Sequence, residues 1–335
     1  MFSKPSSMLL GFKFRNINIR GRDNMRPTWV EIDRYAIRKN IRNLKACTEK
    51  EVDFMGVIKA DAYGHGAVEI AKILQEENVK RFGVVMVEEG IQLREAGFKE
   101  SILILGPIPE EDYSKLLEYE LIPAIYKLSQ AIELNRVAEK ARKKASIHLK
   151  IDTGMGRLGF IPEEQSIKEI KEIINLPNIF VEGIYTHLST ADEKYNEYVK
   201  EQFRRFIFVL DELKKEGITI PIRHMANSAA TINFKEMHLD MIRPGTSIYG
   251  LYPGPEMKEN PTVDLYPAMS IKSKVMHIKS LPTDTSIGYG RTFISKRPSI
   301  IGVIPMGYVD GVFRLLANKG EVLIRGQRCP IVGNV

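Results

Sequence analysis

The sequence predicts an α/β protein, a TIM-type (β/α)8 barrel followed by a smaller, incomplete all-β domain. Three observations predict it. Eight short apolar runs alternate with amphipathic stretches, the rhythm changes to strand-like alternation after Tyr252, and polar or cationic residues follow the ends of the apolar runs. A barrel of this type closes with eight parallel strands, each followed by a helix.

The eight apolar runs are short, rich in Val and Ile, and mostly bounded by turn residues, as expected for buried strands. They are Phe54–Ile58, Phe82–Met86, Ile102–Leu105, Leu121–Ile125, Ser146–Ile151, Ile179–Tyr185, Pro221–Met225 and Leu239–Ile242. Strands that alternate with helices form βαβ units with parallel strands. An open, doubly wound sheet is the competing layout for the same alternation.

Amphipathic stretches lie between these runs, with apolar residues at the spacing of one helix face. We expect helices at Ala67–Glu76, Val87–Ala96, Tyr113–Glu120, Leu128–Lys143, Gln165–Ile174 and Asn196–Glu216. Each would form the crossover connection between two successive strands of the barrel.

The second domain is indicated by YPGPEMKENP, a Pro-rich stretch, and by the alternating segments with Gly turns that follow it. We expect the barrel over residues 25–260 and the β domain over 261–335. The chain stops at Val335 directly after a strand-like run, so we expect this domain to be truncated. Residues 1–24 are basic and aperiodic, which predicts a disordered extension or a start codon assigned too early.

Composition excludes several classes of protein. The 335 residues carry a net charge of +7, which suits anionic small molecules better than nucleic acid, and no run reaches the length of a membrane span. Only two cysteines, Cys47 and Cys329, are present, so a reducing compartment fits, and with no export signal we expect the cytoplasm. We expect no metal, nucleic-acid or membrane partner.

Barrel active sites form where the strands end, and the residues at those ends here are polar. They are Lys59, Lys150 with Asp152 and Arg157, His187, Asn227 with Ser228, and Arg243 with Gly245. Their convergence at one rim predicts an active site, because none of them was needed to assign the strands.

Taken singly, most of these residues have an ordinary explanation. His187 suits a structural histidine, Ser228 a helix N-cap, and Arg243 a surface ion pair; Arg157 could merely close a turn. Lys59 is less ordinary, because its stem lies beside apolar neighbours, and partial desolvation favours a neutral amine suited to Schiff-base chemistry.

GMGRLG, residues 154–159, matches the dinucleotide-binding fingerprint, with Glu182 ending the next strand. Pro162 delays the following helix, so these glycines cannot place a pyrophosphate at its N-terminus. We therefore reject a dinucleotide site here; the arginine inside the loop indicates another anion.

Several motifs occur in a fixed order from Met25 to the last residue: VIKADAYGHGA, HLKIDTGMGRLGF, THLSTADE, HMANSAAT, MIRPGTSIYGLYP, SIGYGRTF and MGYVDG. Together they closely resemble the alanine racemase family. The resemblance implies a pyridoxal-5′-phosphate-dependent isomerase that interconverts L- and D-alanine, with a cofactor-binding TIM-type barrel and a C-terminal β domain. It also implies a role in D-alanine supply for peptidoglycan.

The resemblance assigns the cofactor site. Lys59 would form the internal aldimine, so that the cofactor serves as electron sink. Tyr63, Ser228 and backbone N–H groups near Gly245 and Thr246 would hold the phosphate, with Asn227 beside them. Arg243, supported by His224, would face the pyridine nitrogen; an arginine does not readily give up a proton there.

The resemblance also implies two bases, one on each face of the substrate. Lys59 would serve one face and Tyr289 the other, with His187 linking Tyr289 to Arg243. The family places the tyrosine in the partner subunit's active site, so a homodimer with shared sites is expected. Arg157 would contact the cofactor's phenolic oxygen and the substrate carboxylate, and Lys150 is a candidate for carbamylation.

The family pattern continues beyond CPIVGNV into segments that are absent here. We therefore expect the cofactor ligands to be kept and the racemase activity to be weakened. Two alternatives stay open: a racemase of serine or basic amino acids, and a non-catalytic barrel that binds the cofactor. The second domain, with SIGYGRTF and MGYVDG, argues against the latter.

Overall fold

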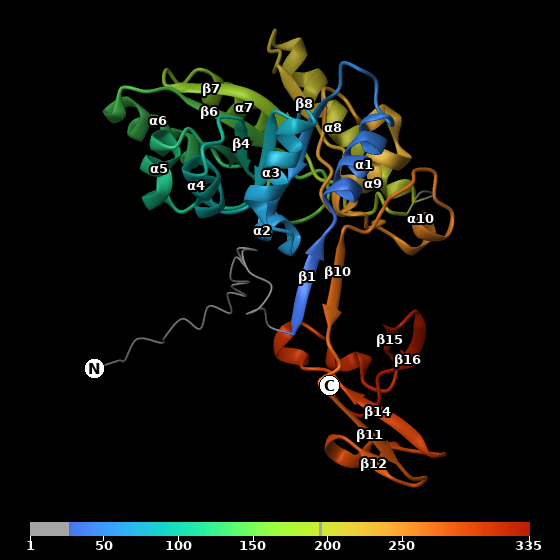
Figure 1. Ribbon diagram of the computed structural model, residues 1–335. Helices are drawn as coiled ribbons and strands as arrows, with labels where there is room; N and C mark the ends of the chain where they lie inside the picture. The colour runs from blue at the N-terminus through green and yellow to red at the C-terminus, as the bar shows by residue number, and fades with distance from the viewer. Residues whose placement is uncertain (1–26, 194–195) are drawn as a thin grey trace, which may run out of the picture. The chain divides into compact units, whose positions relative to one another are not determined.

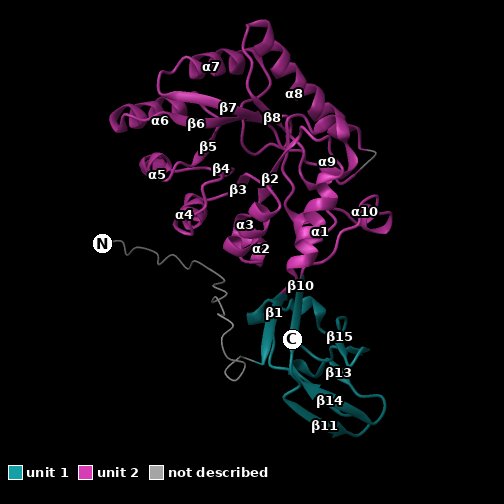
Figure 2. Ribbon diagram, turned by 45° about the horizontal axis from the view of Figure 1, so that its top comes forward, with its two compact units in different colours: residues 1–31, 269–335 teal, residues 32–268 magenta. Residues whose placement is uncertain are grey.

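The computed structural model describes residues 27–193 and 196–335. These fall into two compact units (Figure 2). One holds Ile32–Ala268, and the other holds Met269–Val335 together with the described residues up to Glu31. The expected boundary between residues 260 and 261 stays a prediction, and the extension over residues 1–24 lies outside the described residues.

The larger unit contains an eight-stranded sheet in the order β8-β7-β6-β5-β4-β3-β2-β9, with every neighbouring pair parallel. The strands are β2 (Asp53–Val57), β3 (Arg81–Val84), β4 (Ser101–Ile104), β5 (Ile122–Ile125), β6 (Ala145–Lys150), β7 (Ile179–Tyr185), β8 (Ile222–His224) and β9 (Met241–Ile242). Two backbone hydrogen bonds bring the end strands together, Asp240 N to Arg223 O at 3.0 Å and Arg243 N to Ala226 O at 2.9 Å. These contacts confirm the predicted closed barrel rather than the alternative, an open doubly wound sheet.

Helices follow the strands (Figure 1). They are α1 (Arg34–Lys45), α2 (Lys59–Gly64), α3 (Ala67–Glu76), α4 (Val87–Glu95), α5 (Tyr113–Glu118), α6 (Leu128–Ala141), α7 (Glu164–Ile174), α8 (Glu197–Lys215), α9 (Ser228–Asn233) and α10 (Pro255–Glu259). All six predicted helices are present, with ends within a few residues of those expected. None of the helices in the described ranges is both long and apolar enough to cross a membrane.

Helix α1 was not predicted, although the sequence encodes it clearly. Asp33 caps it by accepting hydrogen bonds from the backbone N–H groups of Tyr35 and Ala36. Its buried residues Ile37, Ile41 and Leu44 recur at helical spacing and face the core. Each such side chain stabilises the fold by roughly 1.5–3 kcal/mol when fully buried.

The barrel unit carries nearly all of the buried apolar side chains in the described chain. Most belong to one cluster formed by the strands and their covering helices. A smaller cluster joins Met55, Leu103, Ile122 and Met241, one from each of four strands. Because the core is built within this unit, the strand ends are held at fixed positions around one rim.

The smaller unit consists of short paired strands, which confirms the predicted all-β character. The strands are β1 (Thr28–Ile32), β10 (Met269–Ser273), β11 (His277–Leu281), β12 (Ser286–Ile287), β13 (Phe293–Ile294), β14 (Ser299–Val303), β15 (Glu321–Ile324) and β16 (Gln327–Pro330). They pair as β1-β10, β11-β14, β12-β13 and β15-β16. Within Met269–Val335 only Ser295 and Gly333 are buried.

Candidate active site

A cavity of about 680 Å³ opens at the carboxyl ends of the barrel strands. Ten of the residues predicted for the site line it: Lys59, Tyr63, Lys150, Arg157, His187, Asn227, Ser228, Arg243, Gly245 and Thr246. Asp152 and His224 do not line it. They come from the segments after β2, β6, β7, β8 and β9, which lie far apart in the sequence. The prediction that these strand ends converge is therefore confirmed.

Arg243 is a buried cation in this cavity, with 4% of its surface exposed. Its guanidinium donates to Thr186 O at 2.8 Å and Met225 O at 3.2 Å, and it lies 3.5 Å from His187 Nδ1. Burial lowers the pKa of Arg243 to about 10, so it stays protonated at neutral pH. The interpretation of Arg243 as a member of a surface ion pair is wrong, because the residue is buried.

Two buried histidines form a hydrogen-bonded chain with Arg243. Arg243 Nη1 donates to His224 Nδ1 at 2.9 Å, and His224 Nε2 lies 2.8 Å from His148 Nδ1. Since arginine can only donate, His224 carries its proton on Nε2 and donates it to His148. Burial, followed by the charge of nearby arginines, lowers the pKa of His148 to about 3 and that of His224 well below its usual value.

Lys150 ends β6 and is also buried, with Nζ 4.5 Å from the centre of the Tyr185 ring. Burial, and then the charges of Arg243 and Arg157, hold the pKa of the Lys150 amine well below its usual range. No carboxylate in the described part of the chain lies within ion-pair distance of it. A buried amine without an anionic partner is suited to being neutral.

The loop that matched the dinucleotide fingerprint holds an anion supplied by the chain itself. The Asp152 carboxylate accepts hydrogen bonds from the N–H groups of Gly154, Met155, Gly156 and Arg157 at 2.8–3.0 Å. Burial alone would raise the pKa of Asp152, but these four bonds together lower it. The loop N–H groups are therefore occupied, which supports the rejection of a dinucleotide site and leaves the exposed Arg157 side chain at the cavity.

Hydroxyl and N–H groups gather on the side of the cavity near α9. Asn227, not Ser228, caps α9, by accepting from Ala230 N at 3.0 Å. The Ser228 hydroxyl instead accepts from Gly245 N at 2.9 Å and from Ser247 N at 3.4 Å, so its own proton is left for a further acceptor. Interpreting Ser228 as the N-cap is therefore wrong.

Because Gly245 has no side chain, a small space, here called the cradle, is open between its backbone and the Tyr63 hydroxyl. A Cβ at Gly245 would lie 2.8 Å from the Tyr63 hydroxyl, closer than side-chain atoms normally approach. Burial raises the pKa of Tyr63, so the phenol keeps its proton and can donate it. Two hydroxyl donors beside a glycine cradle fit a phosphate, and the amine of Lys59 lines the same cavity.

Tyr289 is the one predicted catalytic residue that lies in the other unit. It begins the short 3-10 turn η5 (Tyr289–Arg291), and its side chain is 86% exposed. It is not among the residues that line the barrel cavity. His187, its expected partner, does line the cavity, and burial followed by the surrounding cations holds the pKa of His187 well below its usual value.

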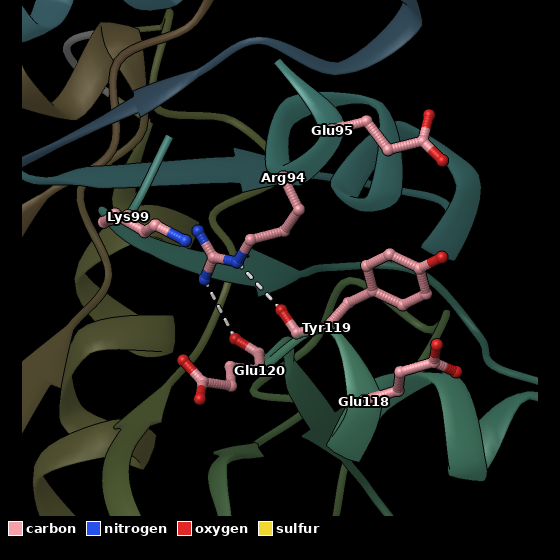
Figure 3. A pocket seen from close by; sticks show the side chains of 6 residues that line it. All are labelled: Arg94, Glu95, Lys99, Glu118, Tyr119 and Glu120. Carbon is pink, nitrogen blue, oxygen red and sulfur yellow. Dashed lines mark hydrogen bonds between the residues drawn. The ribbon is translucent and has the colours of Figure 1, made fainter. Parts of the chain in front are cut away.

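A second hollow, of about 250 Å³, lies beside α4 (Figure 3). Its centre is Arg94, whose guanidinium donates to the backbone carbonyls of Tyr119, Phe98, Glu100 and Glu120 at 2.8–3.0 Å. Burial lowers the pKa of Arg94. Because its donors are used to tie loops together, Arg94 acts here as a structural clamp.

Some residues of the site were missed by sequence reasoning. Glu89 bonds the backbone next to Lys59, and His148 completes the histidine pair. His148 had one available signal, its position two residues before the strand-end lysine, on the same face of β6. Glu89 had none, because nothing in the sequence shows which distant backbone it meets.

Comparison with known proteins identifies the family. The alanine racemase N-terminal domain matches residues 32–253, and the alanine racemase C-terminal domain matches residues 268–335. The alanine racemase of Methanococcus maripaludis is 45% identical over 309 residues, which is 92% of this chain and 82% of that protein. Alanine racemase 2 of Caldanaerobacter subterraneus is 45% identical over 93% of this chain and 80% of its own length.

Solved structures agree. The alanine racemase of Clostridium difficile 630 superposes with a TM-score of 0.88 at 39% identity, over 93% of this chain and 81% of that one. The alanine racemase of Bartonella henselae, solved with covalently bound pyridoxal phosphate, superposes with a TM-score of 0.83 at 28% identity, over 92% and 84%. Because both domains match, these likenesses favour a racemase over a barrel-only cofactor protein. This chain belongs to the alanine racemase family, the pyridoxal-phosphate-dependent isomerases that interconvert L-alanine and D-alanine.

Proposed function

We propose that the cavity at the barrel rim binds pyridoxal 5′-phosphate and racemises alanine by two bases. The observation that carries this proposal is the convergence on one cavity of an amine, a buried arginine and phosphate-fitting donors, Lys59, Arg243 and Ser228. When bound, pyridoxal phosphate supplies an electron sink for the electron pair left at the α-carbon of the amino acid.

The cradle beside Gly245 would hold the phosphate. Ser228 Oγ and the Tyr63 hydroxyl would donate to it, joined by the backbone N–H of Thr246. Asn227 contributes indirectly, since it caps α9 and donates to Leu188 O at 3.3 Å, which orients the segment that carries Ser228. Donors of this kind suit a dianion because they stabilise its charge without moving.

Arg243 would face the pyridine nitrogen. Hydrogen bonds to His224 and to two backbone carbonyls hold the side chain in place, and turning it away would break them. A guanidinium donates a hydrogen bond but keeps its proton at neutral pH. It would therefore leave the ring nitrogen largely unprotonated and limit side reactions that need a protonated ring.

Lys59 would hold the aldehyde carbon of the cofactor and then act as the base on one face of the substrate. Tyr289 of a second subunit would act on the other face. One base removes the α-proton of alanine, and the conjugate acid of the other delivers a proton to the opposite face. An unperturbed phenol is a poor base at neutral pH, so His187, neutral and beside Arg243, would accept a hydrogen bond from Arg243 and donate one to the tyrosine.

A homodimer is supported by the β unit. Its strands leave Ile278, Ile300 and Leu323 exposed, at 65%, 76% and 69%, and Tyr289 belongs to the same unit. A unit that exposes several large apolar side chains is suited to an interface, and a second copy would cover them. Sedimentation of the protein tests this, with a dimer expected.

Lys150 and Arg157 would complete the substrate side. The lowered pKa of the buried Lys150 amine favours its attack on carbon dioxide with loss of one proton, and the resulting carbamate would be an anion beside the guanidinium of Arg157. Arg157 would then be oriented toward the cofactor's phenolic oxygen and the substrate carboxylate. Mass spectrometry under carbon dioxide trapping tests for the added carboxyl group on Lys150.

We further propose that the D-alanine serves peptidoglycan synthesis in the cytoplasm. The two cysteines, Cys47 and Cys329, are unpaired, which suits a reducing compartment. Formation of D-alanine from L-alanine by the purified protein with added pyridoxal phosphate tests the function. Growth that depends on added D-alanine after gene deletion tests its place in the cell.

A further inference from the structure

The backbone directly after Lys59 is left-handed. Ala60, Asp61, Ala62 and Tyr63 have φ angles of 52°, 52°, 55° and 55°, and none of them is glycine. Residues with a Cβ rarely adopt this conformation, and hardly ever several in succession. Such a turn persists only where surrounding contacts hold it, and it carries two residues of the proposed cofactor site, Lys59 at its start and Tyr63 at its end.

Local contacts hold the later part of the turn. His65 Nδ1 lies 3.0 Å from Ala62 O and 3.1 Å from Tyr63 O. The Asp61 carboxylate accepts from Ala67 N at 2.7 Å, which joins the turn to α3. These partners are all within six residues of the groups they bond, so they move with the turn.

The start of the turn is held from another element. Glu89, in the first turn of α4, accepts a hydrogen bond from Ala60 N, the first backbone donor after Lys59, through Oε1. Through Oε2 it accepts from Val85 N at 2.8 Å and Met86 N at 3.1 Å. One carboxylate thus joins the segment after β2 to the segment after β3.

We propose that Glu89 is a positioning residue for the racemase reaction: its carboxylate holds the left-handed turn so that Lys59 and Tyr63 both face the cofactor. The proposal rests on the proposed function of Lys59. The simpler alternative is that Glu89 only caps α4, because Glu at this position commonly bonds the N-cap backbone. The two roles use different oxygens, so they can be separated.

Glu89→Gln separates them. A glutamine keeps one acceptor oxygen, enough for the capping bonds to Val85 and Met86, since Glu and Gln both serve in this motif. Its amide nitrogen cannot accept from Ala60 N. A cap alone would therefore tolerate this change, whereas the clamp on the turn would be lost. Glu88→Gln is the matched control, because Glu88 is the exposed neighbour on the same helix, and the carboxylate that bonds the turn is that of Glu89.

The experiment measures the dissociation constant of pyridoxal phosphate by absorbance titration, kcat and KM for alanine, and the thermal midpoint. For Glu89→Gln we expect cofactor affinity and kcat each to fall about tenfold, as for one lost hydrogen bond to a charged group, with KM and the midpoint nearly unchanged. Glu88→Gln should match the unsubstituted chain. Equal cofactor affinity and kcat in the two variants would overturn the proposal.

A second variant tests the turn directly if Glu89→Gln folds poorly. Glycine adopts positive φ without strain, so Ala60→Gly combined with Glu89→Gln should recover part of the lost cofactor affinity. No recovery would count against the turn as the affected element. If the unsubstituted chain itself binds the cofactor without bonding it to Lys59, the proposed function fails rather than the role of Glu89.

Discussion

The barrel unit and the β unit differ in how far they bury their apolar side chains. The barrel buries its own: Ile170 on α7 and Phe206 on α8 are fully covered by neighbouring elements. The β unit exposes Phe313 and Leu315 at 75% and 81%, and its residues 269–335 bury only Ser295 and Gly333. The barrel therefore has a core of its own around the proposed cofactor site, whereas the β unit carries Tyr289 among exposed apolar side chains, which we propose that a second copy covers.

The largest expected effect is on the chemistry of the barrel. Lys59→Ala removes the amine that we propose holds the cofactor and serves as a base, so we expect alanine racemisation to fall roughly ten-thousandfold or more. A coupled assay for D-alanine measures it. Lys72→Ala, an exposed lysine on α3 paired with Glu69 at 2.6 Å, is the control and should keep its activity. Retained turnover in Lys59→Ala would show that the barrel amine is not the reacting group.

The next effect tests whether the β unit contributes chemistry. Tyr289→Phe removes the proposed second base, and we expect racemisation to fall about 10²–10⁴-fold. In heavy water, α-hydrogen exchange should continue for one alanine enantiomer, because the Lys59 face is intact. Tyr35→Phe, an exposed tyrosine on α1, is the control. Equal loss of exchange for both enantiomers would argue against a base on each face.

The contrast in burial can be tested with one residue type. Ile170→Ala, fully buried in the barrel, should lower the free energy of unfolding by about 2–5 kcal/mol. Ile300→Ala, exposed in the β unit, should cost less than about 0.5 kcal/mol in the monomer. Urea unfolding below and above the dimer dissociation constant measures both; the cost of Ile300→Ala should grow when the dimer forms. If it does not, Ile300 lies outside the interface.

The last comparison concerns pH. His148, His187 and His224 have folded-state pKa values below that of an unfolded histidine, so each stays neutral in the barrel while the unfolded chain protonates near pH 6.5. Below that pH the unfolded state binds more protons, and stability is lost as the pH falls. Each histidine should contribute up to about 1.4 kcal/mol per pH unit between pH 6.5 and 5. Urea unfolding at pH 7.5, 6 and 5 measures the slope; a flat profile would mean that these groups protonate in the folded state.

The sequence predicted the barrel well because each strand and most helices have a clear local pattern. Apolar runs such as Ile102–Leu105 are too short for a helix and rich in Ile, and segments such as Ala67–Glu76 repeat apolar residues at the spacing of a helix face. Barrel geometry then brings the strand ends together, which is why Lys59, His187 and Arg243 could be grouped from their positions in the sequence.

What the sequence did not predict depends on distant contacts. The left-handed turn at Ala60–Tyr63 contains no glycine, so no local signal marks it; it depends on Glu89, 29 residues away. The pairing of β1 with β10 joins segments far apart in the sequence, since Thr28 and Ser273, whose hydroxyls hydrogen-bond, are 245 residues apart. The charge state of Lys150 likewise follows from burial and from arginines brought in by other segments.

The measurement that tests the central claim most directly is chemical trapping of the cofactor. The protein saturated with pyridoxal phosphate is reduced with borohydride, digested and mapped by mass spectrometry. We expect a phosphopyridoxyl group on Lys59 and on no other lysine of the barrel cavity, Lys150 included. An unmodified Lys59 in folded, saturated protein would contradict it.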